Sequence, residues 1–404
     1  MRIVITSNYR LGNETGTAHV AEDLVNYFSK NNNVTYICLG KKFRIVKKTR
    51  LLTVIKIPSI EINKVAIPLI TPDVVYKIFV YLNKFKPDVI HSQNSLFVSN
   101  LVQTWANLNE IPFVVTFHHI PTQVVEHLFP KLPRNLISNL VQDLYKEFSL
   151  KTFLKNTDCV ICLNESVKRS ITKVDKDVQI RIINNGIDFK KIKPISSKSK
   201  LPDTINFIFV GSYNERKNQE YLVNVFSYLP KNYTLNMYGD KKSGKVYADK
   251  VESLMKNLNL KNIKINDYNK NAIEMYSNMH FFISASLKEA QSLAIIEALA
   301  SGIPVIGLKN ETASDLVNTS NGLILPKDTT PKKFALSAFN FIKDVDYKKM
   351  SNNAKSGTKK FNIENVASKI KKVYESTAYS DSENGRRNIS KYYQNIFKPK
   401  ILQK

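Results

Sequence analysis

Short apolar runs alternate with helix-like segments in two successive series, and this pattern constrains the fold more than any other feature of the chain. The first series places strands at residues 2–6, 34–39, 89–91, 113–117, 159–163 and 181–183. The second series places them at residues 207–210, 234–238, 263–265, 280–284 and 304–307. Strands that alternate with helices indicate a parallel sheet covered by helices on both faces. The sequence therefore predicts an α/β protein with two doubly wound domains.

The expected domain boundaries follow from length and composition. A chain of 404 residues is long enough for two or three domains. We expect a first domain over residues 1–192, a polar linker over 193–203 and a second domain over 204–362. A helix over 363–377 is expected to cross back to the first domain, and a basic tail follows over 378–404.

Charge and hydropathy narrow the classes of partner. The chain has 60 Lys and Arg against 34 Asp and Glu, a net charge of +26 that is spread along its length. Such an excess attracts anionic ligands or an anionic membrane surface, and because no half is specially basic we predict no nucleic-acid partner. The most apolar stretch, residues 74–82, is too short to cross a bilayer, and the first residues are too short for a secretory signal. We therefore expect a cytoplasmic protein.

Glycine is scarce, with 12 in the chain, so its positions are informative. Gly16, Gly186, Gly211 and Gly239 are expected at strand ends or in the turns that follow them. Because open α/β sheets bind ligands outside the carboxyl ends of their strands, these turns are expected to face a cleft.

The most specific segment is SASLKEAQSLAIIEALASGIPVI, residues 284–306. Glu289 lies in the loop after a predicted strand, and Glu297 lies eight residues later in a predicted helix. A carboxylate two turns into this helix can accept hydrogen bonds from both hydroxyls of a ribose. The free amides at the helix N-terminus suit an anionic diphosphate. These amides belong to Ser292, Leu293 and Ala294.

This segment resembles the E-x7-E region of the retaining GT-B glycosyltransferases of family four, and its form E-x-Q-x-L is most similar to the diacylglycerol glucosyltransferases. With the motifs below, the resemblance covers the chain to about residue 375. It implies a GT-B fold, in which two Rossmann-like domains face a cleft, and transfer of a sugar from a nucleotide donor with retention of the anomeric configuration. It also implies that Glu289 lies beside the donor sugar.

The segment VGSYNERKN, residues 210–218, resembles the phosphate-binding loop of the same family. Lys217 matches the family's lysine, which acts as a point charge on the donor diphosphate. Ser212 replaces the arginine that usually follows the glycine, and Arg216 is the candidate substitute.

Shorter motifs resemble turns of the family. The segment INNGID includes Asn185 and Gly186 at the expected domain junction. The segment MYGD ends a strand of the expected donor domain with Gly239 and Asp240. Gly16 retains one glycine of the family's Gly-Gly pair on the acceptor side.

In the first domain, the segments HSQNS and VVTFHH also resemble the lipid glucosyltransferases. In that branch the histidine at the position of His118 approaches the donor sugar, and a histidine at a strand end can hydrogen-bond a hydroxyl or carry a proton. His119 and His127 are alternative candidates for this role. His91 and His119 are the candidates on the acceptor side.

We expect neither a metal nor another cofactor. Two Asp-x-Asp pairs, at residues 175–177 and 344–346, have metal-binding spacing but are expected in polar segments that flank helices. A lysine, backbone amides and a helix dipole can together hold a diphosphate without Mg²⁺. The nucleotide sugar is therefore expected as a co-substrate.

Basic segments with interleaved apolar residues predict a membrane-facing surface. They are KKFRIVKKTR at residues 41–50 and the segment 120–137, and the tail 378–404 is either a further contact or disordered. A solvated basic face is the alternative interpretation of residues 41–50.

Together the residues and the resemblance favour transfer of a hexose to a membrane lipid such as diacylglycerol. The favoured hexose is glucose, and the favoured donor is UDP-glucose. The protein would then lie at the inner face of the membrane. A polyprenyl-linked or cell-surface polysaccharide acceptor is the second interpretation. A UDP-sugar 2-epimerase of the GT-B type, and a binding protein with an inactive site, are further alternatives. The sequence leaves the oligomeric state open.

Overall fold

The protein divides into two compact units in a computed structural model that describes residues 1–12, 16–62, 65–118, 145–192, 200–268 and 275–380. The first unit comprises residues 1–186 and the segment from Ile363 onward, and the second comprises Ile187–Asn362. The second unit therefore begins before the polar stretch that was expected to separate the domains.

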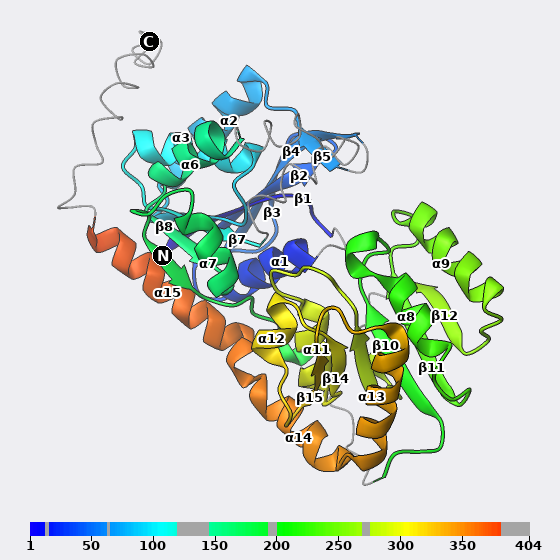
Figure 1. Ribbon diagram of the computed structural model, residues 1–404. Coiled ribbons are helices and arrows are strands. Elements are labelled where there is room, and N and C mark those ends of the chain that lie inside the picture. Colours follow the sequence, from blue (N-terminus) through cyan, green and yellow to red (C-terminus); the bar gives the residue numbers. More distant parts are fainter. Residues whose placement is uncertain (13–15, 63–64, 119–144, 193–199, 269–274, 381–404) are drawn as a thin grey trace, which may run out of the picture. The chain divides into compact units, whose positions relative to one another are not determined.

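A nine-stranded sheet forms the first unit, and its central part is parallel (Figure 1). In spatial order it runs β3-β4-β2-β1-β6-β7-β8-β9, and β5 pairs with β4. In chain order the strands are β1 (Arg2–Arg10), β2 (Asn33–Gly40), β3 (Arg44–Lys47), β4 (Leu52–Ile62), β5 (Val65–Pro68), β6 (Val89–Ser92), β7 (Phe113–Phe117), β8 (Cys159–Cys162) and β9 (Ile180–Ile182).

The sheet departs from parallel pairing at one edge of this unit. Strands β3 and β5 pair antiparallel with β4, and the sequence analysis did not predict these three strands. Only a short turn joins β3 to β4, and a short connection permits antiparallel but not parallel pairing. The basic segment at residues 41–50 therefore contains an edge strand.

Helices of the first unit begin and end at recognisable signals. Thr71 accepts a hydrogen bond from the amide of Val74 at the start of α2 (Pro72–Phe85), which has Pro72 at its first position, and Lys86 ends it in a left-handed conformation. The other helices are α1 (Gly16–Phe28), α3 (Phe97–Leu108), the π-helix Tyr145–Leu150, α6 (Lys151–Lys155), α7 (Glu165–Thr172) and α15 (Ile363–Ser380). Helix α15 packs on α1, so the last described helix is part of the first unit.

A six-stranded parallel sheet forms the second unit, in the order β12-β11-β10-β13-β14-β15. Its strands are β10 (Ile205–Val210), β11 (Tyr233–Gly239), β12 (Ile263–Asp267), β13 (Phe281–Ser284), β14 (Val305–Leu308) and β15 (Gly322–Leu325). Numbered along the chain, this is the order 3-2-1-4-5-6 of a Rossmann fold. The prediction of a doubly wound domain is confirmed here, although β15 was not foreseen.

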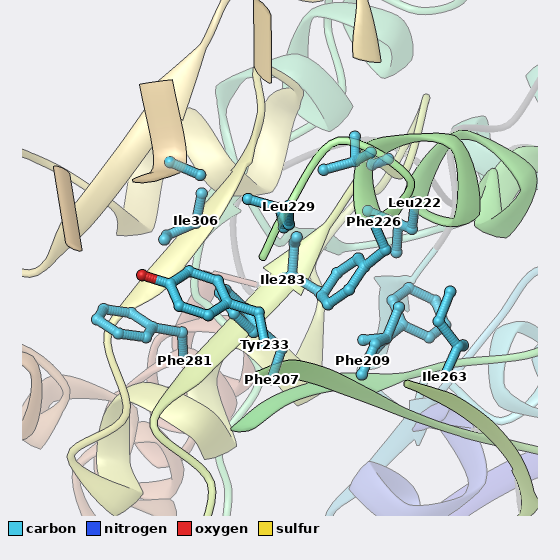
Figure 2. Packing of buried hydrophobic residues seen from close by; sticks show 14 of the residues in the cluster. Phe207, Phe209, Leu222, Phe226, Leu229, Tyr233, Ile263, Phe281, Ile283 and Ile306 are labelled. Carbon is cyan, nitrogen blue, oxygen red and sulfur yellow. The ribbon is translucent and has the colours of Figure 1, made fainter. Parts of the chain in front are cut away.

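Aromatic residues on one face of neighbouring strands pack together with Phe226 of a covering helix in the core of the second unit. Figure 2 shows Phe207, Phe226, Tyr233 and Phe281 packed in one cluster, where Phe207 meets Phe226 edge-on with ring centroids 5.3 Å apart. The helices that cover this sheet are α8 (Gln219–Phe226), α9 (Lys245–Asn257), α11 (Leu293–Ser301), α12 (Glu311–Leu316), α13 (Pro331–Asp344) and α14 (Tyr347–Gly357).

Among the described residues, no helix combines the length and the apolar character that crossing a bilayer would require.

Candidate active site

The candidate donor site lies where the strand order of the second sheet reverses. Strands β10 and β13 are adjacent and parallel, but β10 continues to β11 on one side and β13 to β14 on the other. Their carboxyl ends lie at the same edge, which is where open α/β sheets bind ligands. The loops after these two strands contribute Lys217 and Glu289, which are 72 residues apart in sequence.

Local turns after β10 bury the ammonium group of Lys217. Asn214 caps the short 3-10 helix Glu215–Lys217 by accepting a hydrogen bond from the amide of Lys217 at 3.1 Å. A Cβ at Gly211 would lie 3.2 Å from Cε of Lys217, so the glycine leaves room for the lysine stem. Lys217 is consequently only 9% exposed, and its charge is held at the strand end.

Glu289 joins both basic side chains of the loop after β10 in one cluster. Its Oε1 accepts a hydrogen bond from Nζ of Lys217, and its Oε2 lies 3.3 Å from Nη1 of Arg216. Arg216 also donates to the carbonyl of Lys288 at 2.9 Å. The predicted phosphate ligands and the predicted sugar carboxylate are thus brought together.

Burial and the attraction between Lys217 and Glu289 shift the pKa values of these two side chains in opposite directions. Burial raises the pKa of Glu289, but the charges of Lys217 and Arg216 more than offset this effect and hold that pKa below its ordinary value. Burial lowers the pKa of Lys217, while the charge of Glu289 opposes the shift. A buried ion pair with these partners can present two remaining ammonium N–H groups to an anion.

Helix α12 holds the loop that carries Glu289. Asn310 donates to the carbonyl of Ser286 at 2.9 Å, and Oγ1 of Thr312 donates to the carbonyl of Glu289 at 3.4 Å. The amide of Glu289 donates to Oε2 of Glu311 at 3.3 Å. Sequence reasoning missed these residues, although Asn310 before an acidic first turn is a recognisable helix start.

The structure corrects the expectation that the backbone amide of Ser292 is free. Helix α11 begins at Leu293, with Ser292 as its N-cap, and the Ser292 amide donates to Oγ1 of Thr312 at 3.2 Å. An internal hydrogen bond therefore occupies one of the three amides expected to bind the diphosphate. Leu293 and Ala294 form the first turn of α11, as expected.

Glu297 lies inside α11 and has a hydrogen-bond donor beside it. Oη of the buried Tyr276 lies 3.1 Å from Oε2 of Glu297 and 3.2 Å from the carbonyl of Ala294. Burial and the charge of Glu297 raise the pKa of Tyr276 well above its ordinary value, so the phenol stays protonated and donates. Tyr276 thereby fixes one oxygen of the predicted ribose ligand.

Backbone packing explains several turn residues of the predicted site. A Cβ at Gly239 would collide with the carbonyl oxygen of Gly211, so only glycine lets the ends of β10 and β11 approach this closely. Asp240 accepts a hydrogen bond from the amide of Ser243 at 2.8 Å and so caps the following turn. Ser212 is exposed in the turn after β10.

In the first unit, Gly186 serves packing. A Cβ there would lie 3.0 Å from Cα of Ile363 and from Cβ of Val366, at the start of α15. Asn185 beside it is buried. Gly16 begins α1 and is exposed.

His118 follows β7 and is held by a glutamine from the neighbouring strand end. Its Nε2 lies 2.9 Å from Oε1 of Gln93, which directly follows β6. His118 is 7% exposed and Gln93 is fully buried. Sequence reasoning did not single out Gln93, although it lies within the segment HSQNS.

His91 does not lie where a residue that contacts an acceptor must lie. It is fully buried, its Nδ1 lies 2.7 Å from Oη of Tyr374 in α15, and its Nε2 lies 2.8 Å from Oγ1 of Thr116. Burial lowers the pKa of His91 to about 3, so the ring is neutral. This corrects the assignment of His91 to the acceptor side.

Some predicted features lie outside the described residues. They are His119, His127, the segment 120–137, most of the expected linker and the tail from residue 381. Within the described ranges, no group of three or more His, Cys, Asp or Glu side chains could hold a metal ion.

Solved structures share this architecture. Sucrose-phosphate synthase from Thermosynechococcus elongatus matches 93% of this chain and 98% of its own with a TM-score of 0.74 and 19% identity. HepE of Anabaena, solved with UDP and glucose, matches 93% of this chain and 100% of its own with a TM-score of 0.72 and 15% identity. The predicted fold is therefore confirmed, and it defines the structural class of the protein: a GT-B fold with two Rossmann-like domains.

Sequence families then identify the two halves. The family described as Glycosyltransferase Family 4 matches residues 15–191, and the family described as Glycosyl transferases group 1 matches residues 188–357. Together these two matches cover residues 15–357, which is most of both units, and the chain belongs to the glycosyltransferases that the two families describe. The family resemblance predicted from the motifs is thus confirmed.

Curated relatives match part of the chain. An uncharacterised glycosyltransferase of Methanocaldococcus jannaschii is 24% identical over 253 residues, which is 59% of each chain. The alpha-monoglucosyldiacylglycerol synthase of Streptococcus pneumoniae is 25% identical over 253 residues, 58% of this chain and 55% of its own. An alpha-1,3-galactosyltransferase of Escherichia coli whose name gives a GlcNAc-diphosphoundecaprenol substrate is 26% identical over 239 residues, 56% of this chain and 58% of its own. The chain thus spans less than three-fifths of these relatives.

Proposed function

We propose that this protein transfers a hexose from a nucleotide sugar to a membrane lipid such as diacylglycerol, with retention of the anomeric configuration. The favoured donor is UDP-glucose, so that the transferred hexose is glucose. The observation that carries the proposal is the cluster that buried Lys217 and Glu289 form with the half-buried Arg216 at the switch point of the second sheet. It combines two cations for a diphosphate with a carboxylate that can hydrogen-bond a sugar.

The donor would be held by charge and by hydroxyl recognition. Lys217 and Arg216 would bind the diphosphate oxygens, together with amides of the first turn of α11. Glu297, with its other oxygen fixed by Tyr276, would accept from the ribose hydroxyls. Relatives in solved structures support a nucleotide donor, because HepE was solved with UDP and glucose.

The reaction would break the bond between the anomeric carbon and the β-phosphate oxygen and form a bond from that carbon to the acceptor oxygen. Lys217 and Arg216 would stabilise the negative charge that develops on the departing diphosphate. The proton of the acceptor hydroxyl would pass to that phosphate. Glu289 and His118 would position the hexose by hydrogen bonds. No metal and no further cofactor enter this scheme.

A lipid acceptor is supported by the synthases among the relatives. Besides the enzyme of Streptococcus pneumoniae, the alpha-monoglucosyldiacylglycerol synthase of Acholeplasma laidlawii is 24% identical over 268 residues. We therefore propose an anionic membrane surface as a partner, at the inner face of the membrane.

A candidate docking surface lies at the basic edge of the first unit. In β3, Arg44 and Lys47 are exposed and Ile45 is 47% exposed. Nζ of Lys77 in α2 lies 5.6 Å from the ring centroid of Phe43, and Tyr76 beside it is 65% exposed. Basic groups next to exposed apolar side chains suit an anionic leaflet.

A polyprenyl-linked acceptor is the second candidate, and the galactosyltransferase of Escherichia coli favours it. The named relatives are glycosyltransferases, which supports transfer over the epimerase alternative. The intact ion-pair cluster supports activity over an inactive binding protein.

The test is transfer of radiolabelled glucose from UDP-glucose into micelles of diacylglycerol and phosphatidylglycerol. We expect label in the lipid, and loss of it in Glu289→Ala but not in Glu220→Ala, which removes a partly exposed carboxylate of the same unit. Label that enters only a polyprenyl-linked acceptor would move the assignment to the second candidate. UDP release without any acceptor would favour the epimerase, and no turnover with any common UDP- or GDP-hexose would contradict both transferase assignments.

A further inference from the structure

Four polar side chains form a continuous buried network in the first unit, and the family motifs do not explain it. The network runs from Tyr374 in α15 through His91 and Gln93 to His118. Three of these residues are fully buried and His118 is 7% exposed. Buried polar groups are expensive unless they are hydrogen-bonded, so such a network fixes the orientation of its members.

We propose that Gln93 is a positioning residue that fixes the ring of His118, and that helix α15 supports Gln93 through Tyr374 and His91. The functional consequence rests on the proposed function, in which His118 serves the donor sugar. The positioning itself does not, because it follows from the contacts alone.

Backbone geometry first places Gln93. Gln93 directly follows β6, and its backbone amide donates to the carbonyl of Thr6 in β1 at 3.0 Å. Strand β7 pairs with β6 on the other side, with Ser92 opposite Val115. Gln93 therefore lies between β1 and the end of β7, the two strands beside β6, and its side chain reaches the histidine that follows β7.

The ring of His91 then decides which way the Gln93 amide faces. The Gln93 side-chain nitrogen lies 3.3 Å from Nε2 and 3.4 Å from Nδ1 of His91, so it lies against the ring rather than on one lone pair. An N–H group is attracted to an electron-rich ring face, whereas a carbonyl oxygen is repelled by it. The amide oxygen must consequently face His118, whose Nε2 has to carry the proton of their 2.9 Å hydrogen bond.

Helix α15 fixes His91 in turn. The Tyr374 hydroxyl lies 2.7 Å from Nδ1, and its ring meets the imidazole edge-on with centroids 5.6 Å apart. Thr116 holds the other nitrogen at 2.8 Å. A residue 283 positions away in sequence thus determines the surface on which Gln93 rests.

The test compares two substitutions of nearly equal size in the full-length protein. Gln93→Glu keeps an oxygen that accepts from His118, whereas Gln93→Met keeps the chain length but removes the acceptor. In ¹⁵N-histidine spectra in water, the Nε2–H signal of His118, assigned by its loss in His118→Gln, should persist in wild type and Gln93→Glu. It should vanish by solvent exchange in Gln93→Met. With UDP-glucose, kcat of Gln93→Met should fall about 10- to 100-fold with KM changed less than about twofold.

Gln103→Met is the matched control. Gln103 is another buried glutamine of the first unit, and it donates to the carbonyl of Phe153 and to Thr157 instead. The Gln103→Met substitution should lower Tm as much as Gln93→Met does, while the His118 signal and kcat stay unchanged. Tyr374→Phe should weaken the His118 signal less than Gln93→Met does.

Persistence of the signal in Gln93→Met, or its equal loss in Gln103→Met, would overturn the positioning role. Loss of the signal with an unchanged kcat would support the positioning role and instead contradict the proposed role of His118, so the two failures are distinguishable.

Discussion

The parallel parts of the two sheets share one strand order but place different chemistry at the equivalent position. In each sheet the first strand in sequence lies where the strand order reverses, beside β6 in the first unit and beside β13 in the second. In the second unit this position carries the ion pair of Lys217 and Glu289. In the first unit it carries hydroxyls, amides and imidazoles, such as Thr6, which donates to Ser92 at 2.9 Å.

This difference indicates that the strand order determines where a site lies, and that the side chains of the loops determine which ligand the site can bind. A diphosphate requires cations, and burying a cation requires a counter-charge such as Glu289. A sugar or an acceptor hydroxyl is neutral, and an uncharged network can orient a hydrogen-bonding residue without that cost. The following predictions test this contrast, from the largest expected effect to the smallest.

Removing the cation of the charged site should have the largest effect. In Lys217→Ala, the donor would lose the phosphate ligand proposed for it, and Glu289 stays buried with only Arg216 as a charged partner. We expect about a 10³-fold loss of kcat/KM with UDP-glucose and a loss of about 3–5 kcal/mol in the free energy of unfolding. Steady-state kinetics and urea unfolding measure both.

Lys250→Ala is the control, because Lys250 forms an exposed ion pair with Glu220 in the same unit. It should change neither quantity noticeably. An equal effect of the two substitutions would contradict the special role of the buried pair.

Replacing both charges should separate stability from activity. The double variant Lys217→Met/Glu289→Leu removes the uncompensated carboxylate and refills the space with apolar side chains. Its free energy of unfolding should return to within about 1 kcal/mol of wild type, while activity stays absent. If urea unfolding finds the double variant less stable than Lys217→Ala, the ion-pair account of this site is wrong.

Removing the imidazole of the neutral site should have a smaller and more selective effect. We expect His118→Ala to lower kcat about 10²-fold without changing the affinity for UDP, which lacks the sugar. Kinetics together with UDP titration check both parts. A loss of UDP affinity similar to that of Lys217→Ala would erase the contrast between the units.

The units should also differ in the pH at which they begin to lose stability. Burial lowers the pKa of His91 to about 3 from 6.5, so its stabilising effect is complete above pH 6.5 and declines as the pH falls toward 3. The decline is about 1.4 kcal/mol per pH unit within this window. The pKa of Glu289 is lowered from 4.5, so its contribution persists until the pH falls below that value.

Hydrogen exchange at pH 7, 5.5 and 4.5, expressed as protection factors that correct for the pH dependence of intrinsic exchange, should therefore show lower protection in β6 and α15 at pH values where β10 and β13 remain protected. His91→Gln should abolish this early loss in the first unit. The same acid sensitivity in His91→Gln and wild type would show that another group controls it.

The hydroxyl beside Glu297 should have the smallest effect. Tyr276→Phe removes one hydrogen bond to the carboxylate, worth about 1 kcal/mol, and should weaken UDP binding about fivefold. Tyr221→Phe removes a hydroxyl that donates to the carbonyl of Thr329 in the same unit, and should leave UDP binding unchanged. Equal UDP affinities of Tyr276→Phe and wild type would argue against Glu297 as the ribose ligand.

Much of the second unit could be predicted from the sequence because helices separate most of its described strands. Lys217 and Glu289 were also predicted as site residues, but their contact with each other was not. Their contact depends on β10 and β13 being neighbours, which strand periodicity does not encode. The hydrogen bond from the Ser292 amide to Thr312 was missed for the same reason: the two residues lie at the starts of different helices.

Less of the first unit was predictable. Strand β4 follows β2 with no helix between them, only the edge strand β3, so the alternating pattern that marks the other strands is interrupted there. His91 lies at a strand end like His118, and only the packing of α15, through Tyr374, shows that His91 is buried while Gln93 orients His118.

The central claim is that the charged cluster of the second unit, and not the neutral network of the first, binds the donor nucleotide. Calorimetric titration with UDP of wild type, Lys217→Ala and His118→Ala tests it most directly. We predict that Lys217→Ala weakens binding at least about 100-fold, since a buried charge-assisted contact is lost, and that His118→Ala binds UDP like wild type. Undiminished binding by Lys217→Ala, with a loss in His118→Ala, would contradict the account.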